Sequence, residues 1–535
     1  MKLSIDSLKN EASWQSAGIE IPGYDVAAVA AATKEAPIWV HFGIGNIFRM
    51  FIGGLQDTLL NNGLSNKGIV CVETFDYDIL DKIYKPYDNL VLGVTLKADG
   101  STKRKVIGSL SEALAGKSSD EASWSRLKEI FTSSSLQMVS FTVTEKGYAL
   151  KGSNGEYLPF IKPDIEAGPK APTSAMAVIT ALLYERFLNG KAPVAVVSMD
   201  NCSHNGQKLM DSVLTMADEW AKRGLVDDKF IDWLRDENYV TFPWSMIDKI
   251  TPRPSKDIAD ELEAAGVEAM QPVITDKKTY IAPFVNAEGP QYLVIEDKFP
   301  NGRPTLEAAG VYFTDRDTVN EVERMKVTTC LNPLHTALAV YGCVLGYTSI
   351  AAEMKDTELK KLVYGIGPSE GMEVVCDPKI LSPEDFVNEV LTERLPNAFI
   401  PDTPQRIACD TSQKVGIRYG ETIKSYAAKY GDAANLRYIP IAIAGWLRYL
   451  MAVDDNGEAF ELSPDPMIEE LKGQMSGITF GDSSSVGDKL KPILSNENIF
   501  GSNLYEAGIG ERIEEIFKKE IAGVGAVRAT LAELL

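Results

Sequence analysis

The sequence predicts an α/β protein in which a doubly wound domain with a parallel sheet is followed by a mostly α-helical domain. Between residue 37 and about residue 299, short apolar runs alternate with helix-like segments, which is the pattern of a parallel sheet with crossover helices. Beyond about residue 315, apolar residues recur every three to four positions, which indicates amphipathic helices. The turn-rich segment FPNGRP marks the boundary, so we expect domains over 1–305 and 306–535.

The first domain begins with a polar, helical lead-in over residues 1–35. Strands are expected where short apolar runs lie between turn residues, at 37–42, 67–75, 89–96, 136–145, 192–201 and 291–299. A long helix is expected over 173–190, and 291–299 is taken as the last strand of this domain. The second domain is expected to contain helices at 332–347, 384–395, 438–453 and 511–524.

Composition and charge limit the classes of partner. The 535 residues include 54 Lys and Arg against 75 Asp and Glu, a formal net charge of −21. Because nucleic-acid binding needs a basic face, we expect neither nucleic acid nor an anionic membrane as a partner. No apolar run approaches the ~20 residues of a membrane span, and the first residues lack the apolar core of a signal peptide. The six cysteines form no CxxC pair, so we expect buried thiols, no metal site and a cytoplasmic protein.

A loop with two glycines, HFGIGNIFR, directly follows the first strand and precedes the first helix. A dinucleotide site requires glycines here, because Gly43 permits the tight turn and Gly45 lets the backbone approach a pyrophosphate at the helix N-terminus. Phe48 stands where the third glycine of GxGxxG is expected. The motif alone is weak evidence, but it makes Gly43, Gly45, Asn46, Phe48 and Arg49 candidate cofactor-binding residues.

Glu73 ends the second apolar strand, 28 residues after Gly45. In dinucleotide-binding domains an acid about 20 residues past the loop binds the adenosine ribose. We therefore expect Glu73 to accept hydrogen bonds from the ribose hydroxyls and to repel a 2′-phosphate, which favours NAD over NADP. An ordinary solvated glutamate at a strand end is the alternative, and Asp76 and Asp78 are less well placed.

The segment ERMKVTTCLNPLH is the candidate for chemistry, because it brings together Lys326, Asn332 and His335. Asn332 and His335 are three residues apart, so one helical turn places both on one face. Asn332 is expected to cap that helix, with Pro333 in its first turn. A desolvated Lys can serve as acid and base, and an amide and an imidazole can donate to a developing alkoxide. The alternative is a capped helix with a buried structural histidine, which is how we interpret His41.

Seven sequence blocks together carry a resemblance to a known family. They are HFGIGNIFR, TVTEKGY, SMDNCSHNG, FPWSMIDKITP, ERMKVTTCLNPLHTALAVYG, RLPNAFIPDTPQRIACDTSQK and IPIAIAGWLRYL. They spread over roughly 37–450, and the chain resembles the long-chain, polyol-specific dehydrogenase/reductase family. The resemblance implies an extended Rossmann domain followed by a helical domain, and NAD-dependent catalysis without a metal ion.

The resemblance also implies a role for individual residues. Lys326 is implied as the acid/base, Asn332 and His335 as the groups that polarise the carbonyl, and Glu323 in proton passage. The implied substrate-binding residues are Asn201, Asp248, Arg406 and Lys414.

Two features depart from the family pattern. Lys326 and Asn332 are six residues apart instead of five, which predicts a one-residue bulge or an altered helix start. Val327 occupies the usual offset, and its side chain cannot transfer protons. The segment SHNG replaces a linker of small residues, so His204 is either a local specificity feature or a loop residue.

The implied reaction is hydride transfer between NAD and a keto-sugar or keto-sugar acid. Arg406 and Lys414 could bind a carboxylate, although sugar hydroxyls would suit the same pair. We favour reduction of D-fructuronate to D-mannonate, with mannitol 2-dehydrogenase and tagaturonate reductase activity as alternatives. A sugar-acid epimerase that retains NAD and a non-catalytic sensor are rivals of other classes. We expect a monomer or small homo-oligomer whose partners are small sugars or sugar acids.

Overall fold

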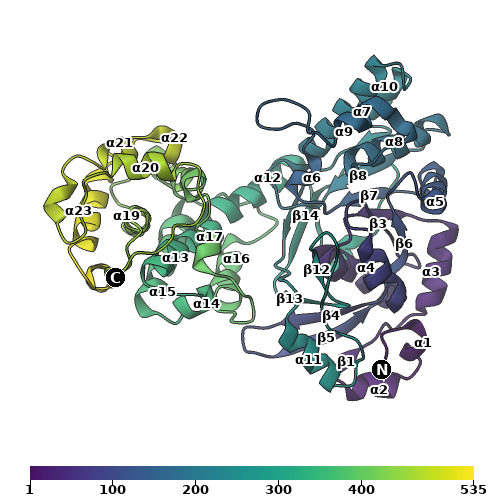
Figure 1. The fold of residues 1–535 in the computed structure, drawn as a ribbon, viewed down its shortest axis with the longest axis horizontal. Helices are drawn as coiled ribbons and strands as arrows, with labels where there is room; N and C mark the ends of the chain where they lie inside the picture. Colours follow the sequence, from purple (N-terminus) through teal and green to yellow (C-terminus); the bar gives the residue numbers. More distant parts are fainter. The chain divides into compact units, whose positions relative to one another are not determined.

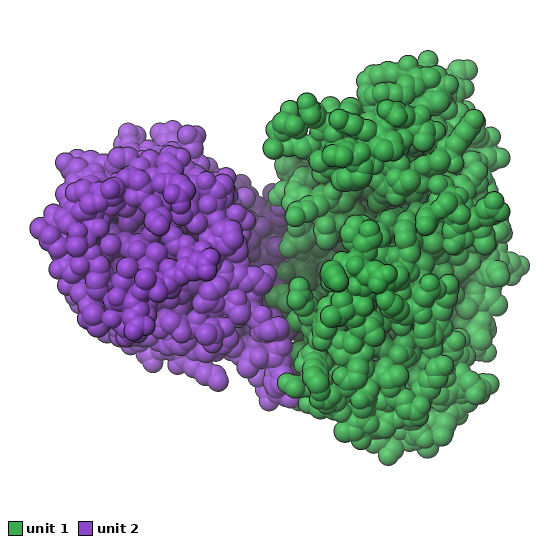
Figure 2. All heavy atoms as spheres, viewed as in Figure 1, with its two compact units in different colours: residues 1–96, 101–320 green, residues 97–100, 321–535 purple.

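The computed structural model describes all 535 residues, which divide into two compact units (Figure 2). Unit 1 contains residues 1–96 and 101–320, and unit 2 contains residues 97–100 and 321–535. The division lies inside helix α12 (Arg316–Met325). The functional boundary between residues 305 and 306 stays a prediction. No helix has both the length and the apolar character needed to cross a membrane.

The main sheet of unit 1 has six parallel strands in the order β6-β3-β2-β7-β8-β9 (Figure 1). Its strands are β2 (Trp39–Phe42), β3 (Ile69–Glu73), β6 (Leu110–Ala115), β7 (Met138–Phe141), β8 (Val194–Ser198) and β9 (Val240–Thr241). The strand order reverses between β2 and β7, which is the point where doubly wound sheets bind ligands at the carboxyl ends of their strands. The predicted doubly wound fold is confirmed.

Both faces of this sheet are buried at its central strands β2, β3, β7 and β8, which explains why these strands are largely apolar. One face packs against α5 (Glu121–Thr132), α8 (Ala175–Leu188) and α9 (Asn205–Lys222) through a cluster that includes Val40, Val72, Val139 and Val196. The other face packs against the helix that follows β2 through a cluster that includes Trp39, Cys71, Met138 and Val197. The core therefore fixes the position of the loop between β2 and that helix.

Smaller sheets complete unit 1. A four-stranded mixed sheet has the order β1-β5-β4-β13, with β1 (Ile19–Glu20), β5 (Thr102–Ile107), β4 (Val91–Leu96) and β13 (Phe284–Glu288). A three-stranded sheet has the order β10-β14-β15, with β10 (Ser245–Asp248), β14 (Tyr292–Glu296) and β15 (Tyr312–Thr314). A hairpin joins β11 (Val273–Ile274) to β12 (Tyr280–Ile281). The remaining helices are α1 (Ile5–Leu8), α2 (Glu11–Ser16), α3 (Val26–Glu35), α6 (Glu145–Tyr148), α7 (Lys162–Ala167), α10 (Lys229–Arg235) and α11 (Lys256–Ala264).

Two expectations about strands are corrected by these sheets. The strand expected at 89–96 exists as β4, but it pairs antiparallel with β5 outside the doubly wound sheet. The strand expected at 291–299 exists as β14, but β15 follows it and is the last strand of this unit. Periodicity identifies a strand without identifying its partner, because pairing depends on residues far away in the sequence.

Unit 2 is helical, as expected beyond residue 315. Its core is built around α13 (Asn332–Val344) and α19 (Tyr438–Leu450), which contact each other and are buried along almost their whole length. The expected helix at 511–524 is α23 (Gly510–Glu520), and the one at 384–395 is α16 (Pro383–Glu389) continued by a π-turn. The other helices are α14 (Ile350–Glu353), α15 (Thr357–Tyr364), α17 (Pro404–Ile407), α18 (Glu421–Tyr430), α20 (Ile468–Gln474), α21 (Lys491–Leu494), α22 (Glu497–Phe500) and α24 (Ala526–Leu534).

Candidate active site

The glycine loop occupies the carboxyl end of β2, at the point where the strand order reverses. Gly43 has a φ of +88°, and a Cβ atom built there would lie 2.2 Å from the Thr142 carbonyl oxygen, so no other residue fits. A Cβ atom on Gly45 would meet nothing within 4 Å. The helix begins at Asn46 and continues through a π-turn (Phe48–Ile52) into α4 (Gly53–Asn61). The loop thus combines a tight turn, an open glycine and a helix N-terminus, which together suit a pyrophosphate.

His41 and Phe48 stabilise the glycine loop by packing against each other beside it. The His41 ring bonds Ser140 Oγ through Nδ1 at 2.6 Å and Thr142 Oγ1 through Nε2 at 2.8 Å. It also stacks on Phe48, with 4.1 Å between the ring centroids. Burial lowers the pKa of His41 to about 3, so the ring is neutral and ties β2 to β7. Its structural interpretation agrees with these contacts, and the stacking explains why Phe48 can stand in place of the third glycine.

Arg49 is a completely buried cation. Its guanidinium donates to the carbonyl oxygens of Ala282 at 2.8 Å and Pro283 at 3.1 Å, and Asn46 Oδ1 lies 3.5 Å away. Burial lowers the pKa of Arg49 to about 10. These contacts anchor the first helix to the segment that leads into β13, so the structure places Arg49 in the support of the loop.

Glu73 lies at the end of β3, where the sequence placed it, but it is buried. Its Oε1 accepts the backbone N–H groups of Thr74, Phe75 and Asp76 at 2.9, 2.8 and 3.2 Å. Burial raises the pKa of Glu73, while these bonds and a further one from the Ile44 amide act in the opposite direction. Glu73 is therefore no solvated strand-end residue: it joins the loop after β3 to the glycine loop.

Asp76 and Asp78 are held by the hairpin between β11 and β12. Asp76 Oδ2 accepts from Thr275 Oγ1 at 2.6 Å, and Asp78 Oδ2 accepts from the Asp276 N–H at 3.1 Å. One oxygen of each carboxylate therefore helps to fix this hairpin.

Asn201 and Asp248 come from separate segments of unit 1. Asn201 is exposed in the loop after β8, and Asp248 is buried at the end of β10. Asn205 ties the two segments together, because its Nδ2 donates to the carbonyl oxygens of Asp200 and Ser245, each at 2.9 Å. The structure thus fixes the β8 loop against β10, the strand that carries Asp248.

The blocks TVTEKGY and SMDN are joined by the Asp200 carboxylate. It accepts the N–H groups of Val143 and Thr144, each at 2.9 Å, and the hydroxyl of Tyr148, which also lies 2.8 Å from Ser198 Oγ. Burial raises the pKa of Asp200 in spite of these bonds. The two blocks therefore form one rigid connection between the carboxyl ends of β7 and β8.

His204 is an exposed residue with a left-handed backbone, φ 53°, at the start of α9. Its ring lies 4.6 Å from that of Trp244, and the Arg316 guanidinium lies 4.9 Å from the same indole. The indole thus has two neighbours from distant segments of the chain.

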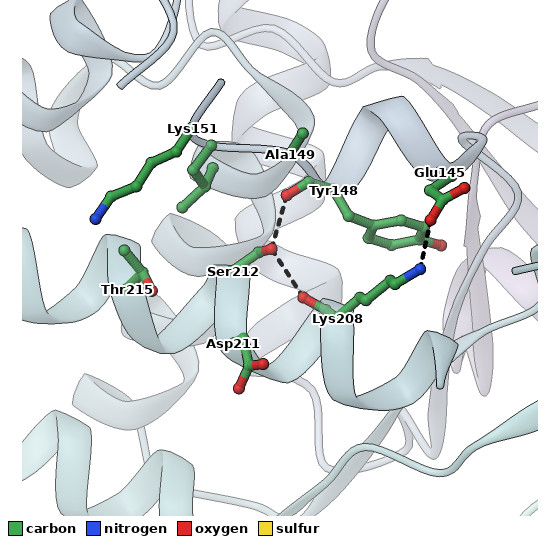
Figure 3. A pocket seen from close by; sticks show the side chains of 9 residues that line it. Glu145, Tyr148, Ala149, Lys151, Lys208, Asp211, Ser212 and Thr215 are labelled. Atoms are coloured by element: carbon green, nitrogen blue, oxygen red, sulfur yellow. Dashed lines mark hydrogen bonds and ion pairs between the residues drawn. The ribbon is translucent and has the colours of Figure 1, made fainter. Parts of the chain in front are cut away.

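A surface hollow of about 390 Å³ lies between α6 and α9 (Figure 3). Lys208 pairs with Glu145 across it, and Ser212 Oγ donates to the Tyr148 carbonyl oxygen at 2.7 Å. None of the residues predicted for catalysis, cofactor or substrate lines this hollow. The hollow is lined in part by Tyr148, whose hydroxyl binds the Asp200 carboxylate in the connection between β7 and β8.

Lys326 lies where the helix that starts as α12 changes into a π-turn (Lys326–Cys330). The Leu331 N–H donates to the Lys326 carbonyl oxygen at 3.1 Å, five residues back, which is the hydrogen bond of a π-bulge. A π-bulge absorbs one extra residue, so the one-residue bulge expected from the six-residue spacing is confirmed. Lys326 is 2% exposed, and Glu323, one turn earlier, is half-buried.

Asn332 and His335 both lie in the first turn of α13. Leu331, not Asn332, is the N-cap, and no side chain caps this end. The expected cap is therefore wrong: the π-turn ends at Cys330, so Asn332 is already the first helical residue. Pro333 is in the first turn, as expected.

Asp402 contacts two of the predicted residues, although sequence reasoning missed it. Its Oδ2 lies 3.0 Å from His335 Nε2, and its Oδ1 accepts from Arg406 Nε at 2.9 Å. Burial acts to raise the pKa of Asp402, but His335 and Arg406 outweigh it and hold the pKa below its usual value. The available signal was an acid four residues before an arginine, a spacing that often pairs two opposite charges.

Lys414 and Arg406 have different partners in this structure. Lys414 is half-buried, and its Nζ donates to the Cys409 carbonyl oxygen at 2.7 Å. Burial, and then the charge of Arg418, lowers the pKa of Lys414. Arg418, which sequence reasoning also missed, bonds Thr336 Oγ1 on α13. Arg418 is therefore a third cationic side chain of unit 2, besides the predicted Arg406 and Lys414.

Glu353 in α14 is a buried carboxyl group without a hydrogen-bond partner on either oxygen. Burial, followed by the charges of Asp356 and Asp402, raises the pKa of Glu353 to about 9. Because the folded protein prefers the protonated form, the stability that this group contributes is complete below about pH 4.5. That stability is lost as the pH rises toward 9, by up to about 1.4 kcal/mol per pH unit.

Glu353→Gln is expected to remove this pH dependence. Its Tm should match that of the wild type at about pH 4.5 and exceed it increasingly toward pH 8, because the amide cannot ionise. Thermal unfolding followed by circular dichroism at several pH values measures the difference. Glu458→Gln, at an exposed position, is the matched control and should show no such trend. A pH-independent difference for Glu353→Gln would contradict the burial of this charge.

The strand order and the glycine turn at its reversal point define a Rossmann-type dinucleotide-binding protein. No group of three or more His, Cys, Asp and Glu side chains is arranged to hold a metal ion. The chain belongs to the mannitol dehydrogenase family: the model of the mannitol dehydrogenase Rossmann domain matches residues 37–308, and that of the mannitol dehydrogenase C-terminal domain matches residues 318–519. The resemblance inferred from the seven blocks is confirmed, and with it the predicted class, a dehydrogenase.

Three known proteins illustrate the similarity. A D-mannonate oxidoreductase from Thermotoga maritima is 54% identical over 100% of this chain and 99% of its own length. The structure of Pseudomonas fluorescens mannitol 2-dehydrogenase with NAD and D-mannitol has a TM-score of 0.69 and 27% identity, covering 100% of this chain and 99% of that one. The structure of a substrate-free D-sorbitol dehydrogenase has a TM-score of 0.77 and 25% identity, covering 95% and 97%.

Proposed function

We propose that this chain reduces D-fructuronate to D-mannonate with NADH, and catalyses the reverse oxidation with NAD. The observation that carries the proposal is the 54% identity over the full length of the D-mannonate oxidoreductase from Thermotoga maritima. Mannitol 2-dehydrogenase activity is the second candidate, because the Pseudomonas fluorescens enzyme shares the fold over the whole chain.

The cofactor is proposed to bind at the glycine loop. Gly43 makes the turn, Gly45 leaves room for the pyrophosphate, and Asn46 starts the helix whose N-terminus attracts it. Phe48 and Arg49 support this helix from the buried side. Glu73 would use its remaining acceptor capacity for the ribose and would repel a 2′-phosphate. When bound, NADH supplies the hydride from nicotinamide C4.

Lys326 is proposed as the proton donor during reduction and the proton acceptor during oxidation. Lys326 is buried in the π-turn that directly precedes α13, the helix that carries Asn332 and His335. Asn332 and His335 hold the carbonyl oxygen through hydrogen bonds that strengthen as it becomes an alkoxide. Glu323, one turn before Lys326, passes the proton between Lys326 and water.

Four residues are proposed to bind the substrate. Asn201 and Asp248 bind sugar hydroxyls, and Arg406 and Lys414 bind the carboxylate end. Arg406 Nε and Nη2 are engaged by Asp402, and Nη1 has no protein partner, so one edge of the guanidinium is available to an anion. A carboxylate at this place distinguishes a hexuronate from a neutral ketose.

We further propose a cytoplasmic enzyme that acts as a monomer or small homo-oligomer. The net charge of −21 favours neither nucleic acid nor an anionic membrane as a partner. The boundary between the cofactor domain and the substrate domain is proposed at residues 305 and 306.

A substrate panel tests the proposal. D-Fructuronate, D-tagaturonate, D-fructose and fructose 6-phosphate are each offered with NADH, and loss of NADH absorbance is recorded. D-Fructuronate is expected to give the highest kcat/KM, and NADPH in place of NADH is expected to lower it. A higher kcat/KM for D-fructose would favour mannitol 2-dehydrogenase activity, and a preference for NADPH would contradict the role of Glu73.

A further inference from the structure

We propose that Asp402 is a positioning residue that holds His335 and Arg406 in one fixed arrangement, with one carboxylate oxygen for each. This inference rests on the proposed function, because it takes His335 as a residue that holds the carbonyl oxygen. It also takes Arg406 as part of the end of the site that binds the substrate carboxylate.

The backbone of Asp402 is fixed on both sides. Its N–H donates to the Ile400 carbonyl oxygen at 2.7 Å, and its own carbonyl oxygen accepts from the Ile350 N–H at 3.0 Å. The residue is only 6% exposed. The carboxylate therefore has a defined place between α13, which carries His335, and α17, which carries Arg406.

Each oxygen of Asp402 serves a different neighbour. Oδ1 accepts from both Nε and Nη2 of Arg406, while Oδ2 lies 3.0 Å from His335 Nε2. Oδ2 has no hydrogen-bond partner of regular geometry, in spite of the short distance to His335, and catalytic contacts commonly align only when substrate binds. Asp402 thus links the group proposed for the carbonyl oxygen with the group proposed for the carboxylate.

The charges around Asp402 keep it ionised. His335, Arg406 and the buried Glu353 face it. Burial alone would raise the pKa of Asp402, but the contacts with His335 and Arg406 hold it below its usual value. Glu353, whose pKa is about 9, stays protonated at neutral pH. Asp402 is therefore the only anion of this group, and it can act solely as an acceptor.

The position of the Asp402 carboxylate determines which nitrogen atoms of His335 and Arg406 can face the substrate. Because Asp402 Oδ2 lies 3.0 Å from Nε2 of His335, the ring nitrogen that remains for a substrate oxygen is Nδ1. Because Asp402 also engages Nε and Nη2 of Arg406, Nη1 is the nitrogen that remains for a substrate carboxylate. Without Asp402 the imidazole could rotate or change tautomer, and the guanidinium could swing into solvent.

The test is a set of double-mutant cycles with D-fructuronate as substrate. Asp402→Asn alone is expected to lower kcat by about 10²-fold, the order of loss for a misplaced catalytic group, and to raise KM. In a His335→Ala background it should lower kcat little further, because the group it positions is gone. In an Arg406→Ala background it should still lower kcat, but should no longer raise KM. NADH affinity should be unchanged throughout, and Glu458→Gln, at an exposed position, is the control that keeps kcat and KM.

Several results would overturn the inference. If Asp402→Asn lowers kcat equally with and without His335, Asp402 does not act through that ring. If the Asn variant fails to fold, Asp402→Glu tests the same point, because it keeps the negative charge but shifts it by one methylene. About a tenfold loss of kcat is expected. Full activity of Asp402→Glu would contradict the positioning role. Failure of the proposed function looks different, because the wild type would then not turn over D-fructuronate at all. An unchanged kcat in His335→Ala would contradict the role of His335 itself.

Discussion

Lys326→Ala is expected to lower kcat for carbonyl reduction by about 10²–10⁴-fold, the contribution of a general acid, while NADH binding is retained. The reason is that the substitution removes the proton donor from unit 2 and leaves the glycine loop of unit 1 untouched. Single-turnover rates with D-fructuronate measure the chemical step, and titration of NADH fluorescence measures cofactor binding.

Lys326→Arg separates proton transfer from simple charge. A guanidinium keeps the positive charge but does not release its proton in proteins, so this variant should be nearly as slow as Lys326→Ala. Full activity of Lys326→Arg would show that the residue acts only by its charge. Near wild-type turnover of Lys326→Ala would make the assignment of the acid wrong.

Gly43→Ala is expected to destabilise the protein by about 2–5 kcal/mol, the largest stability change predicted for the glycine loop. A positive φ costs an alanine about 1–2 kcal/mol, and a new methyl group 2.2 Å from the Thr142 carbonyl oxygen forces the backbone apart. Chemical unfolding measured for the variant and the wild type gives the difference in free energy.

Gly45→Ala is the matched control from the same loop. Its Cβ would meet nothing within 4 Å, so the free energy of unfolding should change by less than about 1 kcal/mol. The methyl group would instead occupy the space expected for the pyrophosphate, and NADH affinity should fall by tenfold or more, about 1.4 kcal/mol. Unchanged NADH affinity in Gly45→Ala would place the cofactor elsewhere.

The sequence predicted best the parts of the fold whose signal is local. The buried strands β2, β3, β7 and β8 are runs of valine and other apolar residues, and the glycine loop follows directly from one of them. β6 was missed because its sequence, LSEALA, consists largely of good helix formers. β9 was missed because it has only two residues.

The site was predictable from residue types but not from their contacts. Counting six residues from Lys326 to Asn332 predicts an irregular turn, and the structure has a π-turn there. Asp402 could not be recognised in the same way, because its contact with His335 joins positions 67 apart in the sequence. The acceptor role of Glu73 toward its own loop was likewise invisible, since it depends on the path of the chain after β3.

The central claim is that this chain transfers a hydride from NADH to the keto carbon of D-fructuronate and releases D-mannonate. NADH carrying deuterium at the transferred position of nicotinamide C4 tests it most directly, with the product analysed by mass spectrometry and NMR. The account predicts D-mannonate with one deuterium on the former carbonyl carbon and one NADH consumed per product. An altered sugar acid without deuterium and without loss of NADH, as an epimerase would give, would contradict it.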